Sequence, residues 1–129
     1  MTAWSYEHRC QWTEDRLHEL ARIFAIELCG YVAMSNHYHV VLYVDREAAT
    51  AWSLDDVIEQ SHQLFSGNLL SRRHRSGEKL SASDASTLST CVETWRERLI
   101  DISWFMRVLN EGIARQANKE DDCTGRFWE

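Results

Sequence analysis

Apolar residues in the first 24 positions recur at intervals of three and four. This stripe consists of Cys10, Thr13, Leu17, Leu20, Ala21 and Phe24. That spacing aligns side chains on one face of an α-helix, while charged residues between them face water. The pattern predicts a helix over residues 5–24, and Ser5 is a suitable residue to cap its start.

The pattern then changes to that of extended chain. Segments 24–34 and 37–44 are rich in β-branched and aromatic residues, which favour strands. Ser35-Asn36 between them has the composition of a two-residue turn. We therefore expect an antiparallel hairpin in which Val32 lies opposite His39 and Ala33 lies opposite Tyr38.

Helices account for most of the remaining chain. Ser53, with Asp56 three residues later, resembles a capping box and opens a helix predicted over 54–70. Segment 71–87 is rich in serine and charge and predicts a loop. Two more helices are predicted, one over 84–99 and one that begins at 101–103. About four helices and one hairpin make a single α+β domain over residues 1–129.

Charge and composition narrow the function classes. The chain has 129 residues, 44% of them apolar, and a net charge of −6, which argues against a dedicated nucleic-acid binder. No apolar run approaches the roughly 20 residues that span a bilayer, and the first ten residues lack a signal-peptide core. We therefore expect a cytoplasmic protein without membrane contact.

One local run, "SRRHRSGEK" (71–79), is basic. It is either a solvated loop or a set of side chains that contact phosphates.

Two histidines two positions apart, His37 and His39, begin the second predicted strand. Residues at i and i+2 of a strand share a face, so both imidazoles can reach one cation, while Tyr38 points the other way. A helix packed over that face is expected to supply a third ligand, and the candidates are His62, Glu59 and Gln63. The alternative is a pair of half-buried strand histidines that bind only backbone or water.

"YVAMSNHYHVVLYV" (31–44) resembles the metal-binding strand of the HUH single-tyrosine transposases, in particular the REP-associated tyrosine transposases. The matching positions are Met34, Ser35, Asn36, His37, Tyr38 and His39. Segment 101–129 is similar to that family's later helix and its Gly-x-x-Trp-Glu turn. Two separate motifs thus occur in the family's order.

The resemblance implies a ferredoxin-like α+β core. It also implies that Mg²⁺ or Mn²⁺ is held by His37 and His39 with a polar side chain of a later helix. In such enzymes the ion polarises a phosphate of single-stranded DNA, and a tyrosine of that helix forms a 5′-phosphotyrosine link. The implied partner is single-stranded DNA with a hairpin. On this reading Arg72, Arg73, Arg75 and Lys79 of the basic run are the expected DNA contacts.

The chain departs from the family at both ends. None of its four tyrosines, Tyr6, Tyr31, Tyr38 and Tyr43, matches the nucleophile's position. The family's first strand also has no counterpart before the first helix. We therefore expect a truncated transposase-like domain that does not nick DNA. The unpaired hairpin edge is expected to join a second copy in a homodimer with a continuous sheet.

Two other functions remain open. One is an unrelated metal-binding hydrolase that uses His37 and His39 with a carboxylate or Cys29; it predicts tight Zn²⁺ binding. The other is a non-enzymatic, self-associating remnant, which predicts neither metal binding nor activity.

Overall fold

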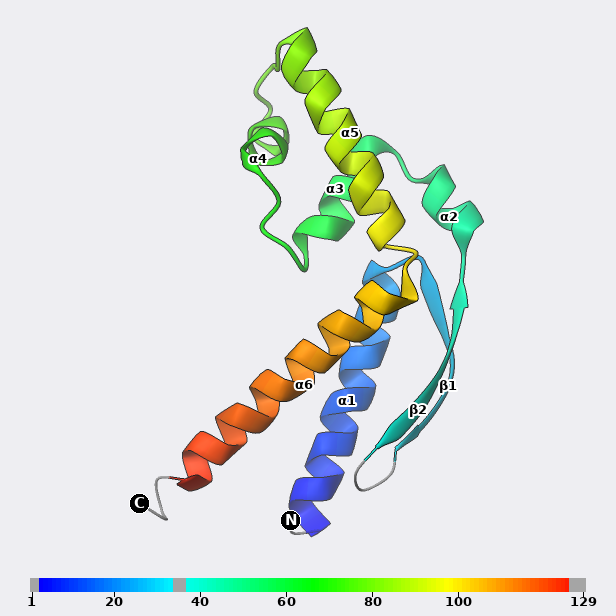
Figure 1. The fold of residues 1–129 in the computed structure, drawn as a ribbon, viewed down its shortest axis with the longest axis vertical. Helices are drawn as coiled ribbons and strands as arrows, with labels where there is room; N and C mark the ends of the chain where they lie inside the picture. Colours follow the sequence, from blue (N-terminus) through cyan, green and yellow to red (C-terminus); the bar gives the residue numbers. More distant parts are fainter. Residues whose placement is uncertain (1–2, 34–36, 126–129) are drawn as a thin grey trace.

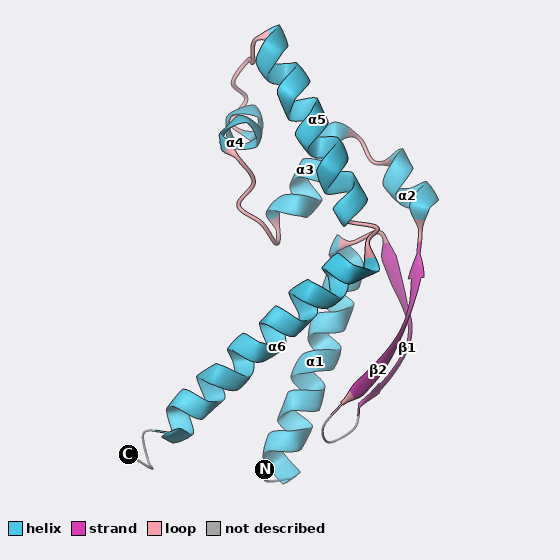
Figure 2. Ribbon diagram, viewed as in Figure 1, coloured by secondary structure: helices cyan, strands magenta, loops and turns pink. Residues whose placement is uncertain are grey.

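The computed structural model of the chain describes the backbone at residues 3–33 and 37–125. Its elements are α1 (Ala3–Ile23), β1 (Ile26–Ala33), β2 (Tyr38–Val44), α2 (Arg46–Ala51), α3 (Leu54–His62), α4 (Leu69–Arg75), α5 (Ala82–Arg98) and α6 (Ile102–Gly125). One antiparallel pair of strands accompanies these helices, so the predicted α+β class is confirmed (Figure 2). The turn predicted at Ser35-Asn36 lies outside the described residues.

The two long helices α1 and α6 lie side by side, and the hairpin runs along α1 (Figure 1). Helices α3, α4 and α5 form a second group. They lie beyond the end of the hairpin where β1 begins and β2 ends (Figure 1). Gln60 of α3 links the two groups: its Nε2 donates to the carbonyl oxygens of Arg22 and Ile23, at 3.0 Å each. These carbonyls belong to the last turn of α1, where no partner exists within the helix.

The hairpin has the register that the sequence predicts near its turn. Val32 pairs with His39, and Ala33 pairs with Tyr38. The register shifts by one residue between Leu28 and Gly30. This shift is a β-bulge, which places an extra residue in β1 and increases the local twist.

The hydrophobic core joins α1, α6 and the start of β1, and it continues into α3 and α5 through Val57, Ile58, Leu88 and Val92. Phe24 and Phe105 pack edge to face, with ring centroids 5.2 Å apart. Leu17 and Leu20 of the predicted α1 stripe are completely buried. The stripe is therefore the face that holds α1 against the rest of the domain.

The segment between residues 46 and 87 is more helical than predicted. Helix α2 follows β2 directly, in a segment for which the sequence predicted no element, and Asp45 caps it by accepting from the Ala48 backbone N–H at 3.0 Å. The capping box of Ser53 and Asp56 is confirmed. The structure thus has six helices within its described residues, where the sequence predicted about four.

The helix predicted over 54–70 is confirmed from Leu54 to His62 but does not continue, because the chain turns near Gly67. Helix α3 ends at His62, and Gly67 has a left-handed φ of +70°. Asn68 then starts α4 by accepting from the Ser71 backbone N–H at 2.9 Å. The loop predicted over 71–87 is confirmed only for residues 76–81, because α4 continues to Arg75 and α5 begins at Ala82.

Candidate functional site

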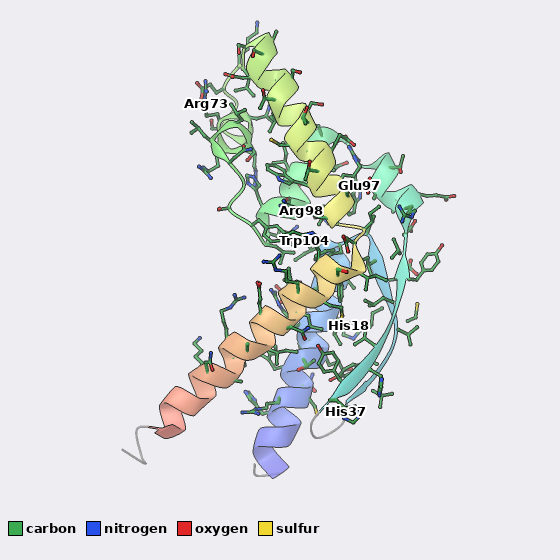
Figure 3. All side chains as sticks on the ribbon, in the orientation of Figure 1. His18, His37, Arg73, Glu97, Arg98 and Trp104 are labelled. Atoms are coloured by element: carbon green, nitrogen blue, oxygen red, sulfur yellow. The ribbon has the colours of Figure 1, made fainter. Side chains whose placement is uncertain are left out.

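The histidine pair lies at the turn end of the hairpin (Figure 3). His37 directly precedes β2 and His39 is its second residue. Both side chains are exposed, and their ring centroids lie 5.3 Å apart with the rings at 88°. The two imidazoles are thus neighbours, as the His-x-His spacing predicts.

Tyr38, between the histidines, faces the opposite side of the hairpin. Its hydroxyl donates a hydrogen bond to Oδ1 of Asn110 on α6. Burial raises the pKa of this phenol above its ordinary value. The prediction that Tyr38 points away from the histidines is confirmed, and its hydrogen bond ties the hairpin to α6.

The expectation that a helix covers the histidine face is wrong for the described residues. Along β2 the side chains alternate between half-buried and exposed, and His39 belongs to the exposed set. On the same face Val32, Val41 and Tyr43 are 56%, 61% and 57% exposed. The other face packs against the core, so α1 and α6 cover the side without histidines.

The proposed third ligands on α3 lie elsewhere. The Arg75 guanidinium donates to His62 Nδ1 at 3.2 Å, because a guanidinium has no acceptor. His62 Nε2 therefore carries the proton and donates to Ser71 Oγ at 2.9 Å. Burial, followed by the nearby charges of Arg75 and Arg72, lowers the pKa of His62. His62 thus joins α3 to α4 and is not directed to the hairpin.

Glu59 is exposed on α3, and Gln63, which is also exposed, is the C-cap residue of that helix. Figure 1 shows α3 beyond the end of the hairpin that is opposite the histidines. Within residues 3–33 and 37–125, no three His, Cys, Asp or Glu side chains are grouped so that they could hold one ion. Cys29 lies at the bulge, and Val32 is the strand partner of His39. The three positions between Cys29 and Val32 correspond to roughly 10 Å along the strand.

The basic run is mainly helical. Arg72, Arg73 and Arg75 belong to α4, and Lys79 follows in the connection to α5. Arg73 forms a two-pronged ion pair with Glu78 at 2.9 and 3.0 Å. This hydrogen bonding raises the pKa of Arg73 and lowers that of the Glu78 carboxyl.

The other basic side chains of the run differ in their hydrogen bonds and ion pairs. Arg72 donates to the Ser66 carbonyl oxygen at 3.0 Å, and Arg75 is bound to His62. Lys79 is exposed and makes no ion pair with another described residue. Arg73 and His37 lie at opposite ends of the molecule (Figure 3). The structure therefore does not bring the basic run and the histidine pair together.

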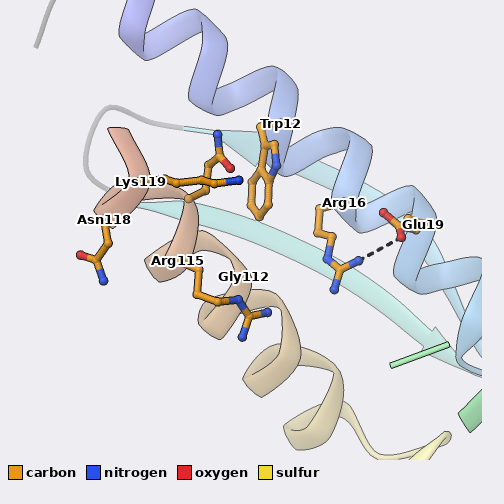
Figure 4. A pocket seen from close by; sticks show the side chains of 8 residues that line it. Trp12, Arg16, Glu19, Gly112, Arg115, Asn118 and Lys119 are labelled. Atoms are coloured by element: carbon orange, nitrogen blue, oxygen red, sulfur yellow. Dashed lines mark ion pairs between the residues drawn. The ribbon is translucent and has the colours of Figure 1, made fainter. Parts of the chain in front are cut away.

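A second basic region was missed by the sequence reasoning. Trp12 and Arg16 of α1 and Arg115 and Lys119 of α6 line a groove between these helices (Figure 4). Each helix contributes two of these residues four positions apart, a spacing that places them on one helical face. That spacing was the available signal, but the sequence did not show that the two faces meet.

Comparisons with family models, with curated proteins and with solved structures find no match to this chain. None of the helices within the described residues has an apolar stretch long enough to cross a membrane. Function must therefore be argued from the histidine pair, the basic side chains and the exposed hairpin.

Proposed function

We propose that this chain is a transposase-type domain that binds single-stranded, hairpin-bearing DNA, holds Mg²⁺ or Mn²⁺ on His37 and His39, and does not cleave the DNA by itself. The observation that carries the proposal is the imidazole pair on an uncovered sheet face. A DNA strand can approach both rings there, because no described helix lies over them.

The geometry of the pair fits a shared ion. Imidazole nitrogens bind Zn²⁺ at about 2.0–2.1 Å, and two rings around an ion of similar size have centroids roughly 5 Å apart. The observed separation of 5.3 Å is close to that value. With two protein ligands, most coordination positions are left for water or phosphate oxygens. The proposed site is therefore a weak one that gains affinity when DNA supplies ligands. When bound, the ion would neutralise charge on a phosphate.

The order of elements supports a ferredoxin-like layout. In that layout two helices pack on one face of an antiparallel sheet, and here α1 and α6 lie on the same face of the hairpin. Helices α2 to α5 would then form an insertion between the hairpin and the second helix of the core.

The positions of the tyrosines support binding without cleavage. Tyr31 and Tyr38 are on the covered face of the hairpin. Tyr43 shares the histidine face but is four residues from His39, which is roughly 13 Å along a strand. A nucleophile must reach about 3–3.5 Å from the phosphorus. None of these three hydroxyls is placed to attack a phosphate held at the histidine pair.

The exposed strands support self-association. In the described residues β1 pairs only with β2, so each strand has one edge without a sheet partner. Such edges readily pair with another chain, especially beside an apolar face. We propose a homodimer in which two hairpins form a continuous sheet.

Fluorescence anisotropy with a hairpin-bearing single strand tests the DNA-binding proposal. We expect saturable binding that Mn²⁺ strengthens, and loss of this metal effect in His39→Gln. Arg72→Ala together with Lys79→Ala is expected to reduce the salt slope, by about 0.7 for each lost phosphate contact. Absence of binding at low salt, with and without Mn²⁺, would contradict the proposed function.

A further inference from the structure

A groove lies between α1 and α6, and the histidine site does not use it. It has a volume of about 530 Å³ and is lined mainly by polar and charged side chains (Figure 4). This volume falls within the roughly 300–1,000 Å³ that is usual for ligand pockets. The groove is therefore large enough for one nucleotide unit of a longer strand.

Gly112 determines how closely the two helices approach. A Cβ at this position would lie 3.3 Å from Trp12 Cη2 and 3.7 Å from Arg16 Nε. The indole of Trp12 can therefore lie directly over the α6 backbone. Trp12 also borders a smaller hollow of about 50 Å³ on the same helix pair. Its ring therefore packs near Gly112 and borders both hollows.

Positive charge predominates around this indole. Arg16, Arg115 and Lys119 line the groove, and Glu19 is its acidic member. Arg16 is paired with Glu19 at 3.0 Å, whereas Arg115 and Lys119 make no ion pair with any described residue. In a chain of net charge −6, two uncompensated cations beside an aromatic ring form a local site for an anion.

We propose that this groove binds a segment of single-stranded DNA, with Arg115 and Lys119 on the phosphates and a base against Trp12. The inference rests on the proposed function and adds a second place where the strand is held. Non-specific single-strand binding combines a basic groove that follows the backbone with aromatic side chains on which bases stack. Those two components coincide here, because the half-buried Trp12 lines the same groove as Arg115 and Lys119.

Charge reversal at one groove position, compared with a matched reversal elsewhere, tests the inference. Arg115→Glu and Arg46→Glu each change the net charge by −2, and Arg46 is an exposed residue at the start of α2, far from the groove. In anisotropy titrations of the full chain with oligothymidylate, we expect Arg115→Glu to weaken binding about tenfold or more and to reduce the salt slope by about 0.7. Arg46→Glu should shift the affinity by less than about threefold, since screening weakens distant charges.

Separate experiments test the proposed contact between a base and Trp12. Trp12→Phe keeps an aromatic ring over Gly112 and should weaken binding by about 3- to 10-fold, since stacking depends on ring size. Photocrosslinking with 5-iodouracil in the strand should join DNA to the peptide that contains Trp12. Crosslinks confined to α4, or a single-stranded RNA that binds tenfold more tightly than DNA, would overturn the assignment.

The outcomes separate the two proposals. If the wild-type chain binds no single strand, the proposed function fails and the groove assignment fails with it. If the chain binds DNA but Arg115→Glu behaves like Arg46→Glu, the groove assignment alone is wrong. If only Arg115→Glu and Trp12→Phe lose affinity, the groove is the strand-holding site.

Discussion

Replacing Gly67 with alanine should destabilise the domain through one specific contact. Gly67 has φ +70°, and a Cβ there would lie 2.3 Å from His62 Nε2 and 2.6 Å from Ser71 Oγ. These two atoms are hydrogen-bonded to each other, and Ser71 is completely buried. The added methyl group therefore has to displace the histidine that joins α3 to α4.

Gly77 provides the matched control. It also has a positive φ, +88°, but a Cβ there would meet no atom within 4 Å. Gly77→Ala adds left-handed strain of about 1–2 kcal/mol, partly offset by about 0.4–1 kcal/mol from the stiffer unfolded chain. We expect a net loss of about 1 kcal/mol in the free energy of unfolding.

Gly67→Ala carries the same backbone strain and also breaks the contacts of His62. Loss of its two hydrogen bonds adds about 0.5–1.5 kcal/mol each. The expected total is roughly 2–4 kcal/mol, a large part of the roughly 5–15 kcal/mol that stabilises most domains. In a His62→Ala background the clash with Nε2 is removed and only the close approach to Ser71 Oγ at 2.6 Å remains, so the difference between the two glycine substitutions should become smaller.

Urea unfolding followed by far-ultraviolet circular dichroism measures these differences. The midpoints should fall in the order wild type, Gly77→Ala, Gly67→Ala, with little change in the slope m. Equal losses for the two alanine variants would show that backbone strain alone matters. That result would refute the proposed His62–Ser71 packing.

Three further predictions follow from the described contacts. Burial lowers the folded-state pKa of His62. The contribution of His62 to stability should therefore be complete above its ordinary pKa of about 6.5 and should decline as the pH falls towards the folded-state pKa. The variant His62→Gln should flatten this pH dependence of the urea midpoint. Incubation with hairpin-bearing single strands and Mn²⁺ should give no covalent protein–DNA adduct, and an adduct abolished by replacing one tyrosine would show that a nucleophile is present. Sedimentation at micromolar concentration should show a homodimer, whereas a cooperatively folded monomer would mean that the strand edges need no partner.

The local pattern in the sequence was sufficient for the elements with strong periodicity. The α1 stripe, the capping box at Ser53 and the pairing of Val32 with His39 are all confirmed. These features depend on residues close in sequence or directly opposite in one hairpin. The division of the predicted 54–70 helix also has a signal in the sequence, since Gly67-Asn68 combines a residue that favours a left-handed φ with a helix-capping residue.

Features that depend on long-range packing were not predictable in this way. The alternation in β2 gives two faces, but it does not say which face α1 and α6 cover, so the sequence does not show that the histidine face is the uncovered one. The groove around Trp12 likewise requires knowing that α1 meets α6 at Gly112. His62 was a candidate ligand by residue type, and only its contacts with Ser71 and Arg75 show its structural role.

The most direct test of the central claim is a Mn²⁺ titration followed by NMR of the histidine side chains, with and without single-stranded DNA. The chain contains six histidines, so four serve as internal controls. We expect paramagnetic broadening of the His37 and His39 imidazole signals together, at lower Mn²⁺ concentration when DNA is present. Broadening that is equal at all six histidines, or that leaves His37 and His39 unaffected, would contradict a shared metal site on the exposed face of the hairpin.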